Sequence, residues 1–405
     1  MSVISIFNGT FCNADAVVRD VIDSTGYRLL TDEMVIISAA EASGMPESKV
    51  RRAFSAKTSV FNKFTHEKEC SIACLRLALA TALKTGPAVV QGFSSLLIPQ
   101  TISHVLRVCI IAETAYRIER AHAQDGSSQK EALKHIHAID ADSAAWVETL
   151  HGLKDPWDAS LYDIIVPMNH LTVEEAGALI EENLIKEAVR PTDASKKAQE
   201  DFLLAARVEM ALSKAGHDVS VSAQDGRVTL TINKQVLMLA RLEEELRAIA
   251  GNMPGVESVE TRVGKDFHEA HIYRKHSFEV PSRVLLVDDE REFVQTLSER
   301  LQLRDVGSAV AYDGKSALTM VNEDDPEVMI IDLKMPGIDG MEILKQVKAT
   351  RPEIEVIVLT GHGSEKDRQE CMALGAFAYM QKPVDIDALS DTLRQAHAKV
   401  QQRNA

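Results

Sequence analysis

The sequence is poor in cysteine and aromatic residues and has no long apolar run. Five of its 405 residues are cysteine, and 5% are aromatic. The cysteines form no Cys-x-x-Cys pair, so a disulfide scaffold is not indicated and a reduced, cytoplasmic protein is expected. No stretch of about 18 apolar residues occurs, so we expect no membrane-spanning helix. Residues 1–7 alternate polar and apolar like a strand and lack the features of a signal peptide.

Positive charge is also scarce. The chain has 45 Lys and Arg against 60 Asp and Glu, which gives a formal net charge of -15. Binding to nucleic acid needs clustered Lys and Arg to contact the phosphates. No stretch of that kind is present, so we expect no nucleic-acid partner.

Two small sets of residues have the types that bind metals. Cys70 and Cys74 stand one helical turn apart, and we favour buried packing over metal binding for them. His268, His271 and His276 form an irregular run with no Cys or carboxylate set to complete a zinc site. We therefore interpret that run as part of a solvated linker.

The length predicts two to four domains. We predict three, at residues 1–190, 198–264 and 282–405. The polar, proline-containing stretch 190–197 indicates a linker, and 265–281 is predicted to be a second one.

Residues 1–190 alternate strand-like and helix-like runs. The expected strands are Val3–Phe7, Ala88–Gln91, Val105–Ile111 and Tyr162–Val166. The expected helices are Ile72–Leu83, Thr114–Gln124, Ser128–Thr149 and Val173–Val189. This alternation predicts an α/β domain with a mostly parallel sheet.

The loop Phe7–Asp15 follows the first strand, where such a sheet would hold a phosphate group. A working P-loop needs several glycines to wrap the phosphate, then a Lys and a Ser or Thr. This loop has only Gly9, lacks the Lys, and adds the negative charge of Asp15. Its chemistry does not favour a nucleotide phosphate.

Four other segments nevertheless resemble the cytidylate-kinase-like family of P-loop kinases. They are Gly26–Met34, Gly86–Gly92, Tyr116–Arg120 and Asp158–Ile165. The resemblance implies a P-loop-kinase-like sheet, with Asp32 near a nucleoside site and Arg117 and Arg120 near a lid. The lid arginine expected after Asp140 is missing, so we predict a degenerate, inactive domain. The residue pattern alone favours a solvated helix face for both arginines.

Residues 198–264 predict a small α+β module. A helix at Gln199–Ala215 is followed by two alternating segments around Asp225-Gly226, a strong hairpin signal. A helix near Val236–Ala250 and a strand at Val256–Val263 complete the order αββαβ. The module resembles a BON domain through Gly226–Leu230 and Pro254–Val259. The resemblance implies binding of a membrane, a ligand or a partner protein. The segment lacks the basic amphipathic face that membrane contact would need, so we favour an interaction or relay role.

In residues 282–405, apolar runs end in residues with distinctive chemistry. Those residues are, in chain order, Asp288 with Asp289, Asp332, Thr360 and Lys382. Each run reads as a buried parallel strand, and parallel strands place such residues at one edge of the sheet. Asp332 alone could equally be a helix N-cap, but a cluster of three acids is tolerable around Mg²⁺. Helices are predicted at Glu292–Arg304, Gly314–Glu323, Met341–Thr350, Glu365–Leu374 and Ile386–Arg403.

This flavodoxin-like (βα)5 arrangement resembles the receiver domain of two-component response regulators. The resemblance implies that Asp332 is the phosphoacceptor and that Asp288, Asp289, Asp332 and the Lys334 carbonyl hold Mg²⁺. It also implies that Thr360 and Lys382 bind phosphoryl oxygens, that Tyr379 is the switch aromatic and that the Lys382–Pro383 bond is cis. Side chains at Lys334 and His362 border the path of hydrolytic water.

The sequence therefore predicts a response regulator phosphorylated by a histidine kinase or phosphotransfer protein. Its output would be protein–protein or ligand contacts of an inactive kinase-like domain, with a downstream protein partner, and a homodimer through the receiver is compatible with the family. One alternative is a nucleoside monophosphate kinase gated by phosphorylation. Another is a phosphate sink or adaptor with no output of its own.

Overall fold

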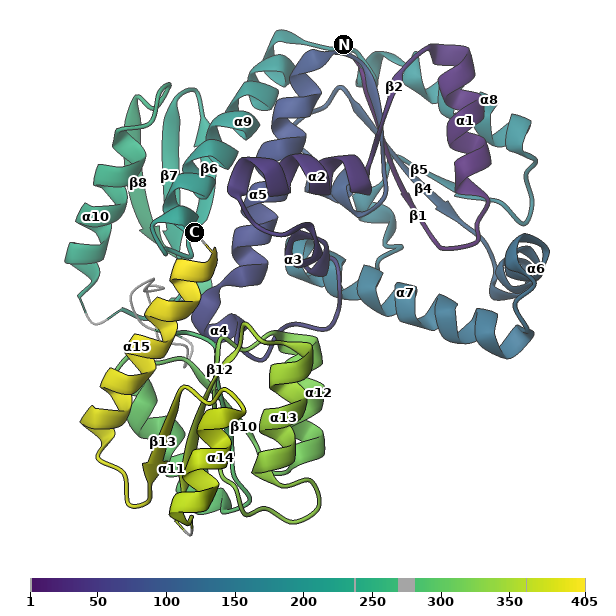
Figure 1. Ribbon diagram of the computed structural model, residues 1–405. Helices are drawn as coiled ribbons and strands as arrows, with labels where there is room; N and C mark the ends of the chain where they lie inside the picture. Colours follow the sequence, from purple (N-terminus) through teal and green to yellow (C-terminus); the bar gives the residue numbers. More distant parts are fainter. Residues whose placement is uncertain (1, 237, 269–280, 362, 405) are drawn as a thin grey trace. The chain divides into compact units, whose positions relative to one another are not determined.

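The computed structural model in Figure 1 describes residues 2–236, 238–268, 281–361 and 363–404. The chain divides into two compact units. Among the described residues, the first unit comprises 2–58 and 67–268, and the second comprises 59–66 and 281–404. No helix within these described ranges combines the length and the apolar character needed to cross a membrane.

A five-stranded parallel sheet forms the centre of the first unit. Its strands are β1 (Val3–Asn8), β2 (Arg28–Thr31), β3 (Ala88–Gln91), β4 (Val105–Ile111) and β5 (Ile164–Pro167). They lie in the order β2-β3-β1-β4-β5, and every neighbouring pair is parallel. The α/β class and parallel sheet predicted for this part are confirmed. Strand β2 was not predicted, because only Leu30 of its four residues is buried.

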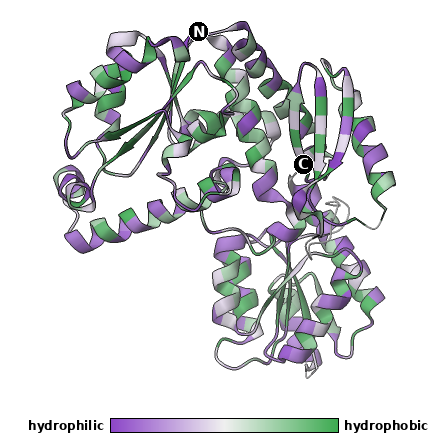
Figure 2. Cartoon of the chain, turned by 180° about the vertical axis from the view of Figure 1, so that it is seen from behind, coloured by the Kyte–Doolittle hydropathy of each residue, from purple (hydrophilic) through white to green (hydrophobic). Residues whose placement is uncertain are grey.

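Helices cover both faces of this sheet. Helices α1 (Ala14–Thr25) and α8 (Val173–Leu184) pack on one face, and α2 (Asp32–Ser43) and α5 (Glu67–Ala82) pack on the other. The strands are predominantly apolar, whereas the helices alternate apolar and polar residues, as Figure 2 shows. The other helical segments are α3 (Glu47–Arg52), η1 (Leu83–Thr85), η2 (Phe93–Leu97), α6 (Thr114–Asp125), α7 (Gln129–His151), η3 (Ala159–Leu161) and η4 (Glu187–Val189).

Helix α9 (Asp193–Lys214) corrects the predicted linker at residues 190–197. Thr192 caps this helix, its hydroxyl accepting a hydrogen bond from the backbone N–H of Ser195, so the polar stretch is a capping box. One face of α9 packs into the core of the large sheet through residues such as Phe202, while another packs on the small sheet through Val208. The helix therefore belongs to both parts of the first unit.

The predicted order αββαβ follows in the middle of the chain. Strands β6 (Ser220–Gln224) and β7 (Arg227–Ile232) are antiparallel, and β8 (Ser258–Val263) lies parallel to β7. Asp225 and Gly226 both have positive φ, as the hairpin turn requires. Helix α10 (Leu239–Gly251) covers the sheet, and a short helix η5 (Lys265–His268) follows β8. Of the three histidines considered for zinc, His271 and His276 lie outside the described residues, as does the side chain of His268.

A second five-stranded parallel sheet forms the second unit. Its strands are β9 (Val284–Val287), β10 (Ser308–Ala311), β11 (Val328–Ile331), β12 (Glu355–Thr360) and β13 (Ala378–Gln381). Their order, β10-β9-β11-β12-β13, is the flavodoxin-like order, which confirms the predicted fold class. The helices are α11 (Arg291–Gln302), α12 (Gly314–Asp324), α13 (Gly340–Thr350), α14 (Glu365–Ala373) and α15 (Ile386–Asn404).

Residues 59–66 complete the core of this second unit, which the sequence did not predict. Phe61 is 0% exposed and belongs to the apolar cluster of the second sheet, and α4 (Asn62–Thr65) follows it. The backbone N–H of Val60 donates a hydrogen bond to Asp324 at 3.3 Å. Phe64 lies so close to Gly307 that a Cβ atom there would be 2.8 Å from the Cβ of Phe64. A segment distant in sequence is thus an integral part of this unit.

Glu327, just before β11, is a buried carboxylate with two partners. It lies 2.9 Å from the guanidinium of Arg283 and 3.1 Å from Nδ1 of His397. Burial alone would raise the pKa of Glu327, but these partners outweigh it and lower the pKa from 4.5 to about 2. The ion pairs therefore stabilise the unit above about pH 4.5, and this contribution is lost as the pH falls toward 2.

We accordingly expect Glu327→Gln to flatten the acid dependence of the second unit's stability. The wild type should lose about 3 kcal/mol more than the variant between pH 6 and about pH 2. Unfolding in urea at several pH values measures this difference. Glu299→Gln, on the exposed side of α11, is the control and should behave like the wild type. Parallel pH profiles for wild type and Glu327→Gln would contradict the assignment.

Candidate functional site

The carboxyl ends of β9 and β11 bring three acidic side chains together. Val287 pairs with Ile331 in the parallel register, so Asp288 and Asp332 follow neighbouring positions of the sheet. The backbone N–H of Asp332 also donates to the carbonyl of Val287 at 3.0 Å. Both apolar strands are fully buried, which fixes where their polar ends emerge.

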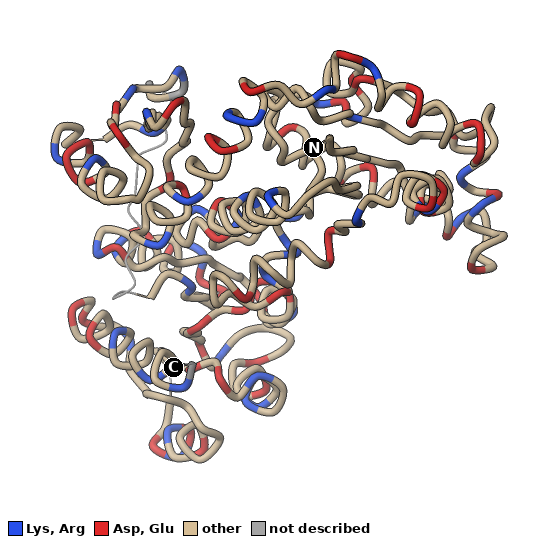
Figure 3. The backbone as a smooth tube through the Cα atoms, turned by 90° about the horizontal axis from the view of Figure 1, so that it is seen from above, with Lys and Arg blue, Asp and Glu red and all other residues tan. Residues whose placement is uncertain are grey.

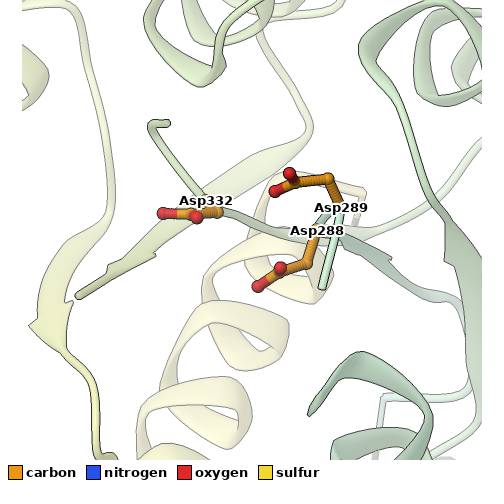
Figure 4. A group of neighbouring side chains, drawn as sticks. All are labelled: Asp288, Asp289 and Asp332. Atoms are coloured by element: carbon orange, nitrogen blue, oxygen red, sulfur yellow. The ribbon is translucent and has the colours of Figure 1, made fainter. Parts of the chain in front are cut away.

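The three carboxylates form one cluster (Figure 4). One oxygen from each of Asp288, Asp289 and Asp332 lies within 4.8 Å of the others. Asp288 and Asp332 are buried, with 3% and 6% exposed, whereas Asp289 faces solvent. Oδ1 of Asp332 is buried without a hydrogen-bond partner among the described residues. Carboxylate oxygens are what Mg²⁺ prefers, so the cluster fits a hard divalent cation.

Lys382, after β13, brings a positive charge to the acids. Its Nζ donates a hydrogen bond to Asp288 Oδ2 at 2.6 Å and lies 3.5 Å from Asp332 Oδ2. Burial alone would lower the pKa of Lys382, but Asp288 and Asp332 outweigh it and raise the pKa. Burial is also the main reason that the pKa of Asp288 is raised. The peptide bond from Lys382 to Pro383 is cis, as expected.

Two neighbours of Lys382 were missed by sequence reasoning. Glu290 lies 3.4 Å from its Nζ, and the ring centroid of Phe293 lies 4.3 Å away. Both residues stand just after the acid pair, at the start of α11. Their proximity to Lys382 depends on the pairing of distant strands, so the sequence carries no local signal for it.

Thr360 and Tyr379 lie on adjacent strands at the same edge. Thr360 ends β12 and is 1% exposed, and Tyr379 on β13 pairs in register with Val358 on β12. The hydroxyl of Tyr379 is buried with no hydrogen-bond partner among the described residues. A Cβ atom at Gly363 would lie 1.6 Å from this hydroxyl and 3.0 Å from Thr360 Cγ2, so only glycine fits there.

Lys334 and His362 are the other residues predicted for this edge of the sheet. Lys334 is exposed in the loop between β11 and α13, where its backbone carbonyl is close in sequence to Asp332. His362, named as a residue that borders the hydrolytic water, lies outside the described residues. Four strands therefore bring six of the predicted residues to one edge of the sheet. These residues are Asp288, Asp289, Asp332, Thr360, Tyr379 and Lys382.

The loop after β1 in the first unit is occupied by the protein's own side chains. Nε of Arg117 donates to the carbonyl of Thr10 at 2.8 Å, and both Nη atoms donate to Asp140 at 2.9 and 2.7 Å. Arg117 is only 6% exposed, so the predicted solvated helix face is wrong for this residue. Arg120 donates to the side chain of Asn13 at 2.7 Å. These arginines fasten the loop to α6 and α7.

Asp32, the predicted neighbour of a nucleoside site, also has partners within the protein. Its carboxylate accepts hydrogen bonds from the backbone N–H groups of Phe93 and Ser94, at 2.8 and 2.7 Å. These bonds hold the start of η2, and burial raises the pKa of the carboxyl group. Asp32 therefore has a structural role here.

Two family models match the chain. The response regulator receiver domain matches residues 284–394, and the cytidylate kinase-like family matches residues 3–170. The two matches cover the second sheet and the first sheet, respectively, and fit the resemblances drawn from the sequence.

Similar curated proteins share the receiver region. Sporulation initiation phosphotransferase F of Bacillus subtilis is 35% identical over 112 residues, which are 28% of this chain and 90% of that protein. The C4-dicarboxylate transport transcriptional regulatory protein DctD of Pseudomonas aeruginosa is 37% identical over 119 residues, 29% of this chain and 26% of the relative. The response regulator MprA of Mycolicibacterium vanbaalenii is 31% identical over 115 residues, 28% of this chain and 50% of the relative. The chain thus spans a quarter to a half of the length of two of these relatives.

Solved structures match the same region. A response regulator receiver domain protein from Clostridium thermocellum is 32% identical. The match covers 30% of this chain and 97% of that protein's chain, with a TM-score of 0.29. The signal receiver domain of a Luxo repressor protein from Vibrio parahaemolyticus is 23% identical. The match covers 31% of this chain and 95% of that domain, with a TM-score of 0.30.

Proposed function

Because the chain belongs to the response regulator family through its receiver domain, we propose that Asp332 accepts a phosphoryl group from a histidine kinase or phosphotransfer protein. The observation that carries this proposal is the placement of Lys382 within 3.5 Å of Asp332, beside a buried carboxylate oxygen that has no partner among the described residues. A free carboxylate oxygen is the nucleophile that acyl phosphate formation needs.

In the proposed reaction, an oxygen of Asp332 attacks phosphorus, and the bond from phosphorus to the donor breaks. The leaving group, which is the imidazole of a phosphohistidine or the carboxylate of a small acyl phosphate, takes the electron pair of that bond. The ammonium of Lys382 is positioned to stabilise the negative charge on the transferring oxygens. Mg²⁺, held by Asp288, Asp289, Asp332 and the Lys334 carbonyl, would neutralise further charge when bound.

Phosphorylation of Asp332 would then act on Thr360 and Tyr379. The new phosphoryl oxygens accept a hydrogen bond from the Thr360 hydroxyl, which moves toward them. The buried hydroxyl of Tyr379, which lies beside Gly363, responds to that movement. A change of local hydrogen bonding thereby alters the surface formed by β12, β13 and the adjoining helices.

The experiment that tests the proposal is phosphorylation of the full chain with acetyl phosphate in the presence and absence of Mg²⁺. After tryptic digestion, mass spectrometry identifies the modified peptide. Modification of the peptide that contains Asp332, dependent on Mg²⁺, is the expected result. Modification elsewhere, or none with either acetyl phosphate or a purified histidine kinase donor, would refute it.

For the output, we propose contacts with a downstream protein or a ligand of the first unit, not DNA binding. The formal charge of -15 supports this, and Figure 3 shows Lys and Arg interspersed with Asp and Glu along the described chain. The middle module, BON-like in its Gly226–Leu230 and Pro254–Val259 segments, would serve as an interaction or relay element. We propose three domains, at residues 1–190, 198–264 and 282–405, with helix α9 shared by the first two and residues 59–66 added to the third.

The kinase-like part is proposed to be inactive. Arg117 occupies the loop that would hold a nucleotide phosphate, and its charge is paired with Asp140. We expect no diphosphate to form when the purified chain is incubated with ATP, Mg²⁺ and CMP, dCMP or UMP. Chromatography of the nucleotides measures the product, and an active nucleoside monophosphate kinase assayed in parallel is the control. Robust diphosphate formation would favour the gated-kinase alternative.

The phosphate-sink alternative makes a different prediction. It requires that a phosphoryl mimic leave oligomeric state and inter-domain contacts unchanged. Scattering of the full chain with and without beryllofluoride separates a phosphate sink from a signalling protein. A signalling output, or a homodimer through the receiver, predicts that the scattering profile changes when beryllofluoride is added.

A further inference from the structure

Four sulfur atoms from three parts of the first unit meet beside helix α5. Cys70 and Cys74 lie one turn apart on α5 and share a face of that helix. Met45, between α2 and α3, places its Sδ 3.7 Å from Cys70 Sγ and 4.0 Å from Cys74 Sγ. Met210 on α9 places its Sδ 3.6 Å from Cys74 Sγ. Helices α2 and α9 both pack against α5, so the cluster is held by the core itself (Figure 1).

We propose that this sulfur cluster is a binding site for copper(I). Thiolate and thioether sulfur are soft ligands, and they select copper(I) among the common biological cations. Zinc sites in proteins are built from Cys, His and carboxylate ligands, and two thioethers do not fit that pattern. The donor set of two Cys and two Met therefore favours a soft monovalent ion.

The distances between the sulfurs suit a shared metal. Sulfur ligands at about 2.3 Å from one metal, with roughly tetrahedral angles, lie roughly 3.8 Å from one another. The three separations of 3.6, 3.7 and 4.0 Å bracket that value. Methionine has an unbranched, adaptable side chain, so small rotations of Met45 and Met210 would bring both thioethers onto the ion.

The environment of the cluster provides both shielding and access. Cys74 and Met210 are 2% and 5% exposed and belong to the apolar core, which keeps water from one side of the site. Cys70 and Met45 are only half-buried, which leaves a route for the ion to enter.

Cys70 and Cys74 pack against the apolar core, as expected, and the structure adds two thioethers to them. Met45 and Met210 join them, and neither is close to this pair in sequence. Cys371 and Met341 in the second unit provide a comparison. Their sulfurs lie 3.9 Å apart, and the described part of that unit contains no other cysteine. That pair is the matched control for ordinary sulfur packing.

The test is an anaerobic titration of the reduced full chain with copper(I) in competition with bicinchoninate, whose absorbance reports the chelated metal. We expect the wild type to withhold one copper per chain. The double variant Met45→Leu/Met210→Leu, which conserves volume, should bind at least about tenfold more weakly. The double variant Cys70→Ser/Cys74→Ser should lose the site, and Met341→Leu should bind like the wild type.

Three results would overturn the proposal. In the first, the wild type leaves all copper with the chelator. In the second, Met341→Leu weakens binding as much as the Met45→Leu/Met210→Leu double variant does. The third concerns the ligands of the bound copper. X-ray absorption of the copper-loaded wild type does not depend on any variant folding. It should show a shell of sulfur only, and nitrogen or oxygen ligands in that shell would also exclude this site.

Discussion

Substitution Asp332→Asn is expected to abolish phosphorylation of the chain by acetyl phosphate or by a histidine kinase. The amide has no anionic oxygen to attack phosphorus, and the neighbouring carboxylate of Asp288 is held by Lys382 at 2.6 Å. The substitution is nearly isosteric, and it removes one charge from a cluster of three acids, so the fold should survive. Phosphoryl label that stays on the purified chain and is released by alkali or hydroxylamine, as expected of an acyl phosphate, measures the effect.

The controls separate chemistry from folding. Asp339→Asn alters the capping residue of α13, which accepts a hydrogen bond from the N–H of Glu342 at 2.9 Å, and should leave labelling intact. Lys382→Met keeps Asp332 but removes the cation 3.5 Å away, so labelling should slow by about 10²-fold or more. Label retained by Asp332→Asn at the level of wild type would show that another residue is the acceptor.

Phe61→Ala is expected to destabilise the second unit by about 3–5 kcal/mol. Phe61 is fully buried in the core of that unit, so its removal leaves a cavity lined by apolar side chains. Because the stability of a whole domain is only about 5–15 kcal/mol, this loss should lower the unfolding midpoint by many degrees. Calorimetry of the full chain, with the receiver transition assigned by its shift in beryllofluoride, measures the change.

Two variants test whether burial of Phe61 is the cause. Val60→Ala changes the adjacent residue, which is 38% exposed, and should have little effect. Phe61→Leu preserves most of the apolar volume and should recover most of the lost stability. If the receiver transition is the same in Phe61→Ala and in wild type, residues 59–66 do not support this unit.

The chemistry of the second unit could be predicted from the sequence because each functional residue directly follows an apolar run. A buried strand needs a continuous apolar segment, and its end is marked by the first polar residue, as at Asp288 and Asp332. The order of the sheet then follows from right-handed connections between parallel strands. Glu290 and Phe293 could not be assigned, since their partner Lys382 is about 90 residues away in the chain.

The first unit was predicted less completely. The charge of Arg117 suggested exposure, but Asp140 and the Thr10 carbonyl satisfy it in the interior. The polar stretch before residue 198 suggested a linker, but Ser195 and Thr192 use their polar groups to begin a helix. In both cases a polar residue is bonded within the fold, and composition alone cannot distinguish that from contact with water.

The contribution of residues 59–66 to the second unit also has a consequence during protein synthesis. Phe61 leaves the ribosome early, while strands β9 to β13, which surround it in the finished core, are made about 220 to 320 residues later. At about 5–20 residues per second, this delay is on the order of 10–60 s. Throughout that interval the nascent chain carries an apolar segment whose binding place does not yet exist. The order of synthesis therefore makes the second unit dependent on a segment that emerges long before the rest of that unit.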